Sequence, residues 1–317
     1  MKLASKLIAV AAILAIAGLV GMPSARARQA PEFAGISQWI NSPPLTMQGL
    51  RGKVVLIDFW TYSCINCLRT LPHVTHWYRK YKDNGLVIVG VSSPEFDFEK
   101  DAANVKRAVE RFGITYPVAL DNGLNTWNAW NNRFWPAEYL VDRDGTVVMH
   151  HYGEGHYLET ENAIRKLLGL EPLDKDSLLE PDLSHIGSPE MYLGLARVHN
   201  MANALPLARL SRDYTAPKRL DLNQYALQGH WRLRDEYAET SGNDGEIRLH
   251  FRAAKVNMVA SSDKPVTLAI TVDGTPQPAV TVQESKLYTL FTGKPGEHVL
   301  TVKIPKDGLR AFTFTFG

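Results

Sequence analysis

The fold of this chain is decided by the stretch Ile57-Asp58-Phe59-Trp60-Thr61-Tyr62-Ser63-Cys64-Ile65-Asn66-Cys67. Its first residues, 57–60, are the end of an apolar run over 53–60 that is rich in β-branched residues. Such a run is typical of a buried strand. Its last part begins a segment, 64–81, in which apolar residues recur at the spacing of an amphipathic helix. The two cysteines are therefore predicted to lie where a buried strand ends and a helix begins.

The chain has only two cysteines, Cys64 and Cys67, and they form one Cys-x-x-Cys motif. A disulfide between residues three apart closes too small a loop to restrict the unfolded chain much, so a structural staple explains the motif poorly. The N–H groups and the dipole at a helix start stabilise a thiolate. We therefore expect a redox-active pair, with Cys64 as the nucleophile and the less exposed Cys67 as the resolving cysteine.

Asp58 lies inside the apolar strand, six residues before Cys64. Burial raises the pKa of a carboxyl group, and a raised pKa suits the exchange of a proton with Cys67. We therefore expect Asp58 to be a third catalytic residue. The alternative is a carboxylate at the strand end that faces solvent.

The rest of the chain divides into two patterns. Residues 53–168 alternate apolar runs with helical segments: strands are expected at 53–60, 86–91, 137–141 and 146–152, and helices at 64–81, 102–112 and 159–168. This order predicts an α/β domain with an antiparallel strand pair at its end. From about residue 221 apolar residues recur at every second position between turn signals, which predicts an all-β sandwich.

Four parts are therefore expected along the chain. Residues 1–27 have a basic start, an apolar stretch of about 15 residues and the site Ala25-Arg26-Ala27, which is typical of a cleaved signal peptide. Residues 28–170 form the redox domain, 171–220 a proline-punctuated linker with one short helix near 190–203, and 221–317 the sandwich. The signal peptide predicts a periplasmic or otherwise extracytoplasmic location.

Composition excludes several other classes of protein. The chain has 317 residues, of which 45% are hydrophobic, so it is not a disordered chain. Lys+Arg 35 against Asp+Glu 33 leaves a net charge of +2 with no basic run, so nucleic acid is not an expected partner. Cys64, Cys67, His73 and His76 would all lie on one helix, so neither a metal nor another cofactor is expected.

Several motifs around the cysteines resemble those of the thioredoxin superfamily. They are Asp-Phe-Trp at 58–60, Cys-x-x-Cys at 64–67, Pro72, and Trp135-Pro136 before a terminal hairpin. The segment between Val91 and Trp135 resembles the insert of the exported TlpA/ResA-like redoxin branch. The segments 60–67, 93–96, 153–155 and 188–194 are more similar still to the extracytoplasmic C-terminal region of DipZ-type proteins.

The resemblance implies a thioredoxin-like α/β domain followed by a jelly-roll-like β-sandwich similar to a carbohydrate-binding module. It also implies that Pro136 is cis and lies against the cysteines, that Asp58 matches the family's buried carboxylate, and that Glu95 approaches the active site from the insert. Aromatic residues beside the site are expected to form an apolar collar for substrate peptides, with core packing as the alternative: Trp60, Tyr62 and Trp135.

Two features depart from the family pattern. The membrane-embedded electron-transfer domain that precedes this region in DipZ-type proteins is not seen, so the electron donor is expected to be a separate membrane protein of the CcdA/DsbD type. Thr70 stands where reducing TlpA/ResA-type proteins carry a glutamate, which argues against a specialised role in cytochrome maturation.

The leading interpretation is an exported thiol–disulfide oxidoreductase that acts on protein thiols and disulfides. One alternative is a redoxin-type thiol peroxidase, although Tyr62 and Ser63 do not supply the usual peroxidatic setting. The other is a module that binds a glycan or a partner protein through the sandwich, where Trp231, Tyr237 and Tyr288 are candidates for stacking on sugar rings. The direction of electron flow stays open.

Overall fold

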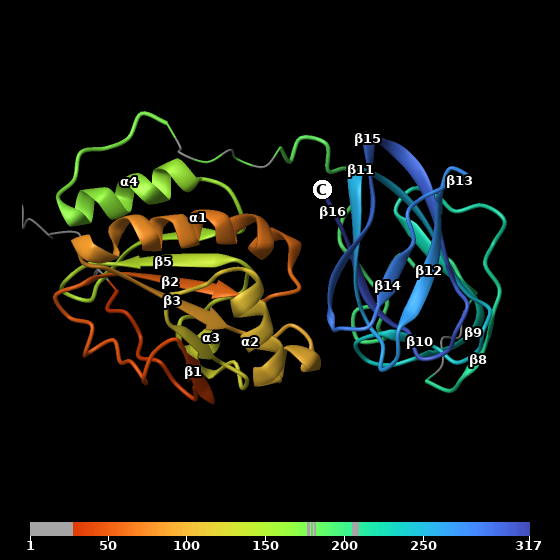
Figure 1. The fold of residues 1–317 in the computed structure, drawn as a ribbon, viewed down its shortest axis with the longest axis horizontal. Helices are drawn as coiled ribbons and strands as arrows, with labels where there is room; N and C mark the ends of the chain where they lie inside the picture. The colour runs from red at the N-terminus through yellow and green to blue at the C-terminus, as the bar shows by residue number, and fades with distance from the viewer. Residues whose placement is uncertain (1–27, 176–177, 179, 181, 205–208) are drawn as a thin grey trace, which may run out of the picture.

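The computed structural model describes residues 28–175, 178, 180, 182–204 and 209–317, and they form two domains that lie side by side (Figure 1). The expected signal peptide, 1–27, lies outside the described residues. Within the described part of the chain, no helix has both the length and the apolar character that crossing a bilayer requires.

The first domain is built on a six-stranded sheet in the order β1-β4-β3-β2-β5-β6. Strands β2, β3 and β4 are parallel, and β1, β5 and β6 join them in antiparallel pairs. Because β2 lies inside the sheet and both faces are covered, all seven of its residues are buried. The strand bounds are β1 Gln38–Ile40, β2 Val54–Trp60, β3 Leu86–Ser92, β4 Val118–Leu120, β5 Ala137–Val141 and β6 Val147–Tyr152.

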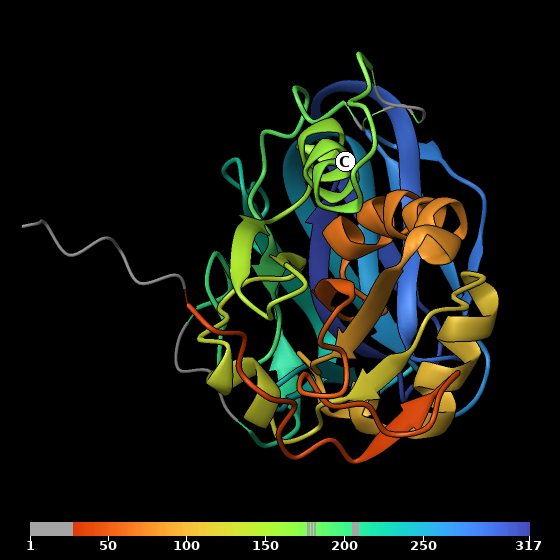
Figure 2. The same ribbon diagram turned by 90° about the vertical axis from the view of Figure 1, so that its left-hand side faces the viewer.

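Helices cover both faces of this sheet (Figures 1 and 2). Helices α1, α2 and α4 share one core, which includes Trp77, Val105 and Ile164. Helix α3 and the N-terminal segment cover the other face, with Trp127 and Leu50 in a second core. The helix bounds are α1 Ile65–Tyr81, α2 Ala102–Arg111, α3 Asn125–Ala129 and α4 Tyr157–Leu168, with short 3-10 helices at Lys82–Asn84 and Asp97–Lys100. The expected α/β domain is confirmed.

The second domain is the expected all-β sandwich. Its longest strand pair is β11 with β15, and β11 changes its other neighbour from β9 to β16 along its length, so the sheet folds over its own core. Alternate residues of β12 are buried, as the period of two predicts. The bounds are β7 Met191–Tyr192, β8 Arg212–Tyr214, β9 Gln224–Leu233, β10 Ala238–Thr240, β11 Gly245–Ser261, β12 Val266–Val272, β13 Thr275–Pro276, β14 Val280–Val282, β15 Lys286–Ile304 and β16 Arg310–Phe316.

The segment between the domains differs from the expectation. The short helix expected near 190–203 does not form: Met191 is buried and pairs with Phe314 of β16 as part of β7. Strand β8 pairs with β9 in the same sheet. Strands β7 and β8 thus lie within 171–220, so the sheet takes up residues from the range that was expected to be a linker.

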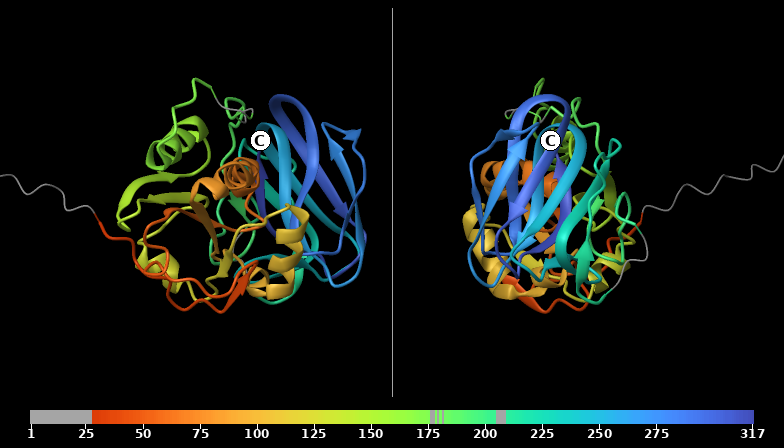
Figure 3. Two further views of the ribbon diagram at one scale, coloured as in Figure 1. Left: turned by 60° about the vertical axis from the view of Figure 1, so that its left-hand side comes forward. Right: turned by 90° about the vertical axis from the view of Figure 1, so that its right-hand side faces the viewer.

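The two domains are held together by an aromatic cluster at their interface. Phe96 and Phe98, from the loop after β3, pack against Phe312 of β16 with ring centroids 5.1 and 4.9 Å apart. Polar contacts lie beside this cluster, where the backbone N–H of Asp97 donates to the carboxylate of Glu236. The end of the chain lies between the domains beside α1 (Figure 3).

Candidate functional site

Cys64 lies at the junction of β2 and α1 and is the N-cap residue of α1. Its backbone is extended, and its Sγ accepts a hydrogen bond from the N–H of Cys67 at 3.5 Å. A sulfur in this position faces the N–H groups that the first turn of a helix leaves without intrahelical partners. Cys64 is half-buried, whereas Cys67 is buried behind it, and both are free thiols in this structure.

The thiol of Cys67 is held in its neutral form. Burial raises the pKa of Cys67 well above its usual value, and the hydrogen bond with Cys64 and the charges of Cys64 and Asp58 raise it further. A buried thiol with a raised pKa does not attack until a base removes its proton. Cys67 therefore needs a proton acceptor close by.

Asp58 is a buried carboxyl group whose charge acts on Cys67. Its side chain is 1% exposed, and its Oδ1 has no hydrogen-bond partner among the described residues. Burial without such a partner raises the pKa of Asp58 to about 7. The expectation of a buried carboxylate is confirmed. With a pKa near neutral pH, the protonated and the deprotonated forms of the group are present in similar amounts, so it can both accept and donate a proton there.

A second buried carboxyl group, Glu138, lies beside Asp58. The two residues are paired in register between β2 and β5, so their side chains share one face of the sheet. Burial raises the pKa of Glu138 to about 8, with the charge of Asp58 as a further cause. Sequence reasoning missed this residue, because the signal is a glutamate in the apolar strand 137–141 and only strand pairing places it beside Asp58.

A third buried carboxyl group, Glu99, fixes the loop that leads to Cys64. It accepts a hydrogen bond from Ser63 Oγ at 2.6 Å and others from the backbone N–H groups of Glu95 and Phe96 at 2.7 and 3.1 Å. Burial and the charge of Glu95 raise the pKa of Glu99 to about 7. Glu99 thus links Ser63, the residue before Cys64, to the loop after β3, a role that sequence reasoning also missed.

The Trp135–Pro136 peptide bond is cis, which confirms the expectation. The carbonyl oxygen of Trp135 lies 3.9 Å from Cys64 Sγ, so this segment forms one wall beside Cys64. The indole of Trp135 donates to the carbonyl of Ser93 at 2.9 Å and holds that wall in place.

Two other expectations about this site need correction. Trp60 and Tyr62 do not form a collar for substrate, because they are 0% and 3% exposed and pack in the core of the first domain. Glu95, which was expected to approach the active site, is bound by the second domain. Its Oε1 accepts hydrogen bonds from Tyr192 and Arg197 of the second domain, each at 2.7 Å, so it joins the domains instead.

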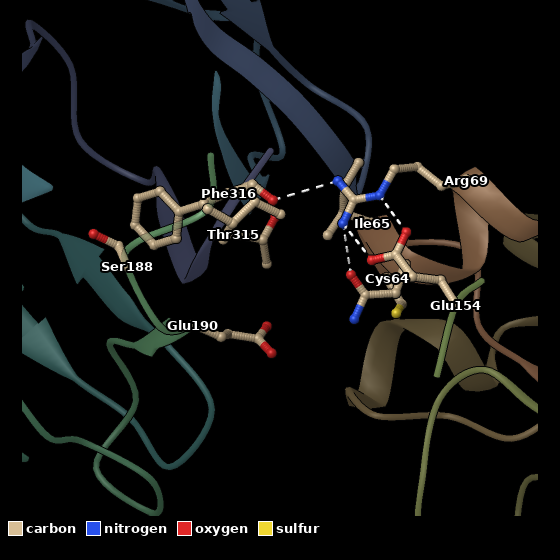
Figure 4. Close-up of a pocket in the computed structure, with 10 residues that line it drawn as sticks. Cys64, Ile65, Arg69, Glu154, Ser188, Glu190, Thr315 and Phe316 are labelled. Atoms are coloured by element: carbon tan, nitrogen blue, oxygen red, sulfur yellow. Dashed lines mark hydrogen bonds and ion pairs between the residues drawn. The ribbon is translucent and has the colours of Figure 1, made fainter. Parts of the chain in front are cut away.

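A pocket of about 230 Å³ opens beside Cys64, and both domains line it (Figure 4). Arg69 of α1 bridges its rim: it donates to Glu154 at 2.6 and 2.7 Å, to Asn66 at 2.8 Å and to the carbonyl of Phe316 at 3.3 Å. The second domain adds further residues on the opposite wall, including Ser188, Glu190 and Thr315. Cys64 therefore faces a pocket that the first domain alone does not form.

The sandwich aromatics that were candidates for stacking on sugar rings pack against protein instead. Trp231 is fully buried, and its indole donates to the carbonyl of Gln228 at 2.8 Å. Tyr288 is 8% exposed and donates to the carbonyl of Glu284 at 2.7 Å. Tyr237 packs against Phe312 in the interdomain cluster.

Comparison with known proteins matches both domains to families. Residues 28–168 match the redoxin family, and residues 188–317 match a family described as the thioredoxin-like C-terminal domain. Over 299 residues the chain is 40% identical to protein DipZ of Mycobacterium tuberculosis, an alignment that covers 91% of this chain and 43% of DipZ. The chain thus spans less than half the length of that relative.

Two shorter similarities cover the first domain. The chain is 33% identical over 109 residues to the thiol-disulfide oxidoreductase ResA of Halalkalibacterium halodurans, covering 34% of this chain and 59% of that protein. The solution structure of a thioredoxin-like protein in the oxidized form is 30% identical, with a TM-score of 0.43, and the match covers 46% of this chain and 99% of that one.

Proposed function

The chain belongs to the redoxin branch of the thioredoxin superfamily and resembles DipZ, and from this premise we propose that it is a thiol–disulfide oxidoreductase whose active pair is Cys64 and Cys67. The observation that carries the proposal is that three groups follow one another from the pocket surface into the protein interior. Cys64 faces the pocket, Cys67 is buried behind it, and Asp58 is buried within electrostatic reach of Cys67.

In the reducing direction, the thiolate of Cys64 attacks one sulfur of a substrate disulfide. A bond forms between Cys64 and that sulfur, and the other substrate sulfur leaves as a thiolate and takes up a proton. The thiol of Cys67 then gives its proton to Asp58 and attacks Cys64, which releases the second substrate thiol. The pair ends as a disulfide, oxidised by two electrons, and the substrate disulfide is reduced by the same two. The oxidising direction is the reverse.

The wall formed by Trp135 and Pro136 is proposed to bind the substrate chain. Proline has no N–H, so the neighbouring backbone groups stay free to pair with an extended peptide. The position of the Trp135 carbonyl beside Cys64 Sγ supports this role.

An extracytoplasmic site of action and a separate membrane electron donor of the CcdA/DsbD type are part of the same proposal. The signal-peptide pattern of residues 1–27 and the resemblance to DipZ support them. The reduction potential of the Cys64–Cys67 pair, measured against glutathione, will show whether the protein acts as a reductant or as an oxidant of its substrates.

The proposal is tested with residues 28–317 and their single-cysteine variants. The wild type is expected to catalyse reduction of insulin disulfides by dithiothreitol, and Cys64→Ser to abolish that catalysis. Cys67→Ser is expected to accumulate mixed disulfides with substrate proteins. Rapid consumption of hydrogen peroxide without disulfide reduction would instead support the thiol peroxidase.

A further inference from the structure

Of the charged side chains that line the pocket beside Cys64, one forms no ion pair with any residue that the structure describes. Arg69 and Glu154 neutralise each other through two hydrogen bonds, with side chains only 17% and 9% exposed. The remaining hydrogen bonds of Arg69 go to Asn66 and to the carbonyl of Phe316. Because the guanidinium is almost fully engaged, it has little capacity left to bind an anionic substrate group.

Glu190 is that group; Tyr192 and the charge of Arg197, which forms an ion pair with Glu95, act on its carboxylate and oppose the rise of its pKa. It comes from the segment just before β7, and it has no ion pair among the residues that the structure describes; its side chain accepts a hydrogen bond from Thr313 at 3.2 Å. Figure 4 shows its carboxylate pointing from the second domain toward the sulfur of Cys64 across the pocket. The residue as a whole is exposed, but burial of the carboxyl end of its side chain and the charge of Glu95 raise the pKa of Glu190 to about 7. A cation placed in the pocket would relieve both effects.

We propose that Glu190 binds a basic side chain beside the reacting cysteine of the substrate, so that the second domain selects cationic cysteine-containing segments. This inference rests on the proposed thiol–disulfide exchange and names its substrate class. An extended peptide advances about 3.4 Å per residue. A lysine or arginine next to the cysteine that bonds to Cys64 therefore reaches into the pocket, where Glu190 faces it from the opposite wall.

The proposal predicts a preference that depends on charge. The probes are three synthetic peptides, acetyl-Gly-Xaa-Cys-Xaa-Gly-amide, each carrying its cysteine as a mixed disulfide with 5-thio-2-nitrobenzoate, where Xaa is Lys, Gln or Glu. Reduced residues 28–317 attack the peptide sulfur, and the released thionitrobenzoate is followed by stopped-flow absorbance. At pH 8, where the Glu190 carboxylate is charged, we expect the lysine peptide to react about two- to fivefold faster than the glutamate peptide, the range that a partly exposed ion pair supports.

Two variants at one position isolate the cause. Glu190→Gln is expected to bring the ratio of lysine to glutamate rates near one, and Glu190→Lys to invert it. The matched control is Glu110→Gln on an exposed position of α2, which should keep the wild-type ratio. Division by each peptide's rate with dithiothreitol removes the intrinsic effect of its charge on its disulfide.

The outcomes separate this inference from the proposed function. If wild type reduces all three peptides at equal normalised rates, or if Glu190→Lys keeps the wild-type order, Glu190 does not select substrate although the exchange reaction stands. If wild type reduces none of the peptides, the proposed function itself has failed.

Discussion

At the scale of single residues, two sulfurs three positions apart have opposite properties. Cys64 is half-buried and faces the pocket, whereas Cys67 is buried and burial raises its pKa. We expect iodoacetamide to modify Cys64 at least about tenfold faster than Cys67 in the reduced protein at pH 7, because the thiolate is the reacting species. Peptide mapping by mass spectrometry measures both rates. Equal rates would show that the two thiols have similar access and acidity.

Asp58 is expected to make stability depend on pH. Because burial raises its pKa from 3.8 to about 7, the folded protein keeps a proton there between about pH 4 and 7 that the unfolded chain has released. Stability contributed by this group is therefore full below about pH 4 and is lost as the pH rises through 7. Asp58→Asn should raise the free energy of unfolding by on the order of 2–4 kcal/mol at pH 8 and change it little at pH 4, as urea denaturation at the two values will show.

The same substitution tests the catalytic role. In the proposed reaction Asp58 accepts the proton of Cys67, so Asp58→Asn should slow resolution of a preformed mixed disulfide on Cys64 at least about tenfold at pH 7. Asp83→Asn, at an exposed position after α1, is the matched control and should change neither stability nor resolution. A stabilised protein that resolves at the wild-type rate would place Asp58 outside the reaction.

At the scale of elements, α1 is fastened to the second domain by Arg69. Its guanidinium joins Glu154, in the loop after β6, to the backbone of β16. Arg69→Gln leaves the mostly buried Glu154 carboxylate without its partner, so we expect a loss of about 2–3 kcal/mol in stability, which thermal unfolding measures. Arg79→Gln, on an exposed position of the same helix, should stay within about 0.5 kcal/mol of the wild type.

Which elements could be read from the sequence depends on how local their determinants are. The junction of β2 and α1 was predictable, because the apolar run and the helical spacing lie within 30 residues. Strand β7 was not predictable, because a strand of two residues shows no periodicity. Met191 belongs to a strand only because it pairs with Phe314, more than 100 positions away in the sequence. Tertiary pairing decides such short segments.

The residues of the site also differ in how local the determinants of their positions are. The roles expected for Cys64 and Cys67 depend on their own spacing and on the helix that follows, which sequence displays. Trp60 was expected beside the substrate, but aromatic character does not reveal which side of a strand is covered, and the residue is in the core. Glu138 and Glu190 become part of the site only through strand register and domain packing, respectively.

At the scale of the whole molecule, the pocket depends on how the domains dock. Phe312 packs against Phe96 and Phe98 across the interface. Phe312→Ala should destabilise the protein by about 2–4 kcal/mol. It should also increase the radius of gyration in small-angle X-ray scattering, as the domains separate.

A comparison within the sandwich shows whether that effect belongs to the interface. Phe251→Ala removes a ring of the same size from the core of the second domain, where the side chain is fully buried. It should lower stability without increasing the radius of gyration at temperatures where the protein stays folded. If both variants leave the radius unchanged, other contacts are enough to keep the domains together.

The wall that carries Glu190 and Phe316 follows the redox domain in the chain, and this order has a consequence for the nascent protein. The redoxin match ends at residue 168, and Phe316 of the wall follows 148 residues later. At translation rates of about 5–20 residues per second, that interval lasts roughly 8–30 s. Until then the chain contains Cys64 but lacks part of the wall that the second domain supplies, so the pocket beside Cys64 is complete only after both domains have been made.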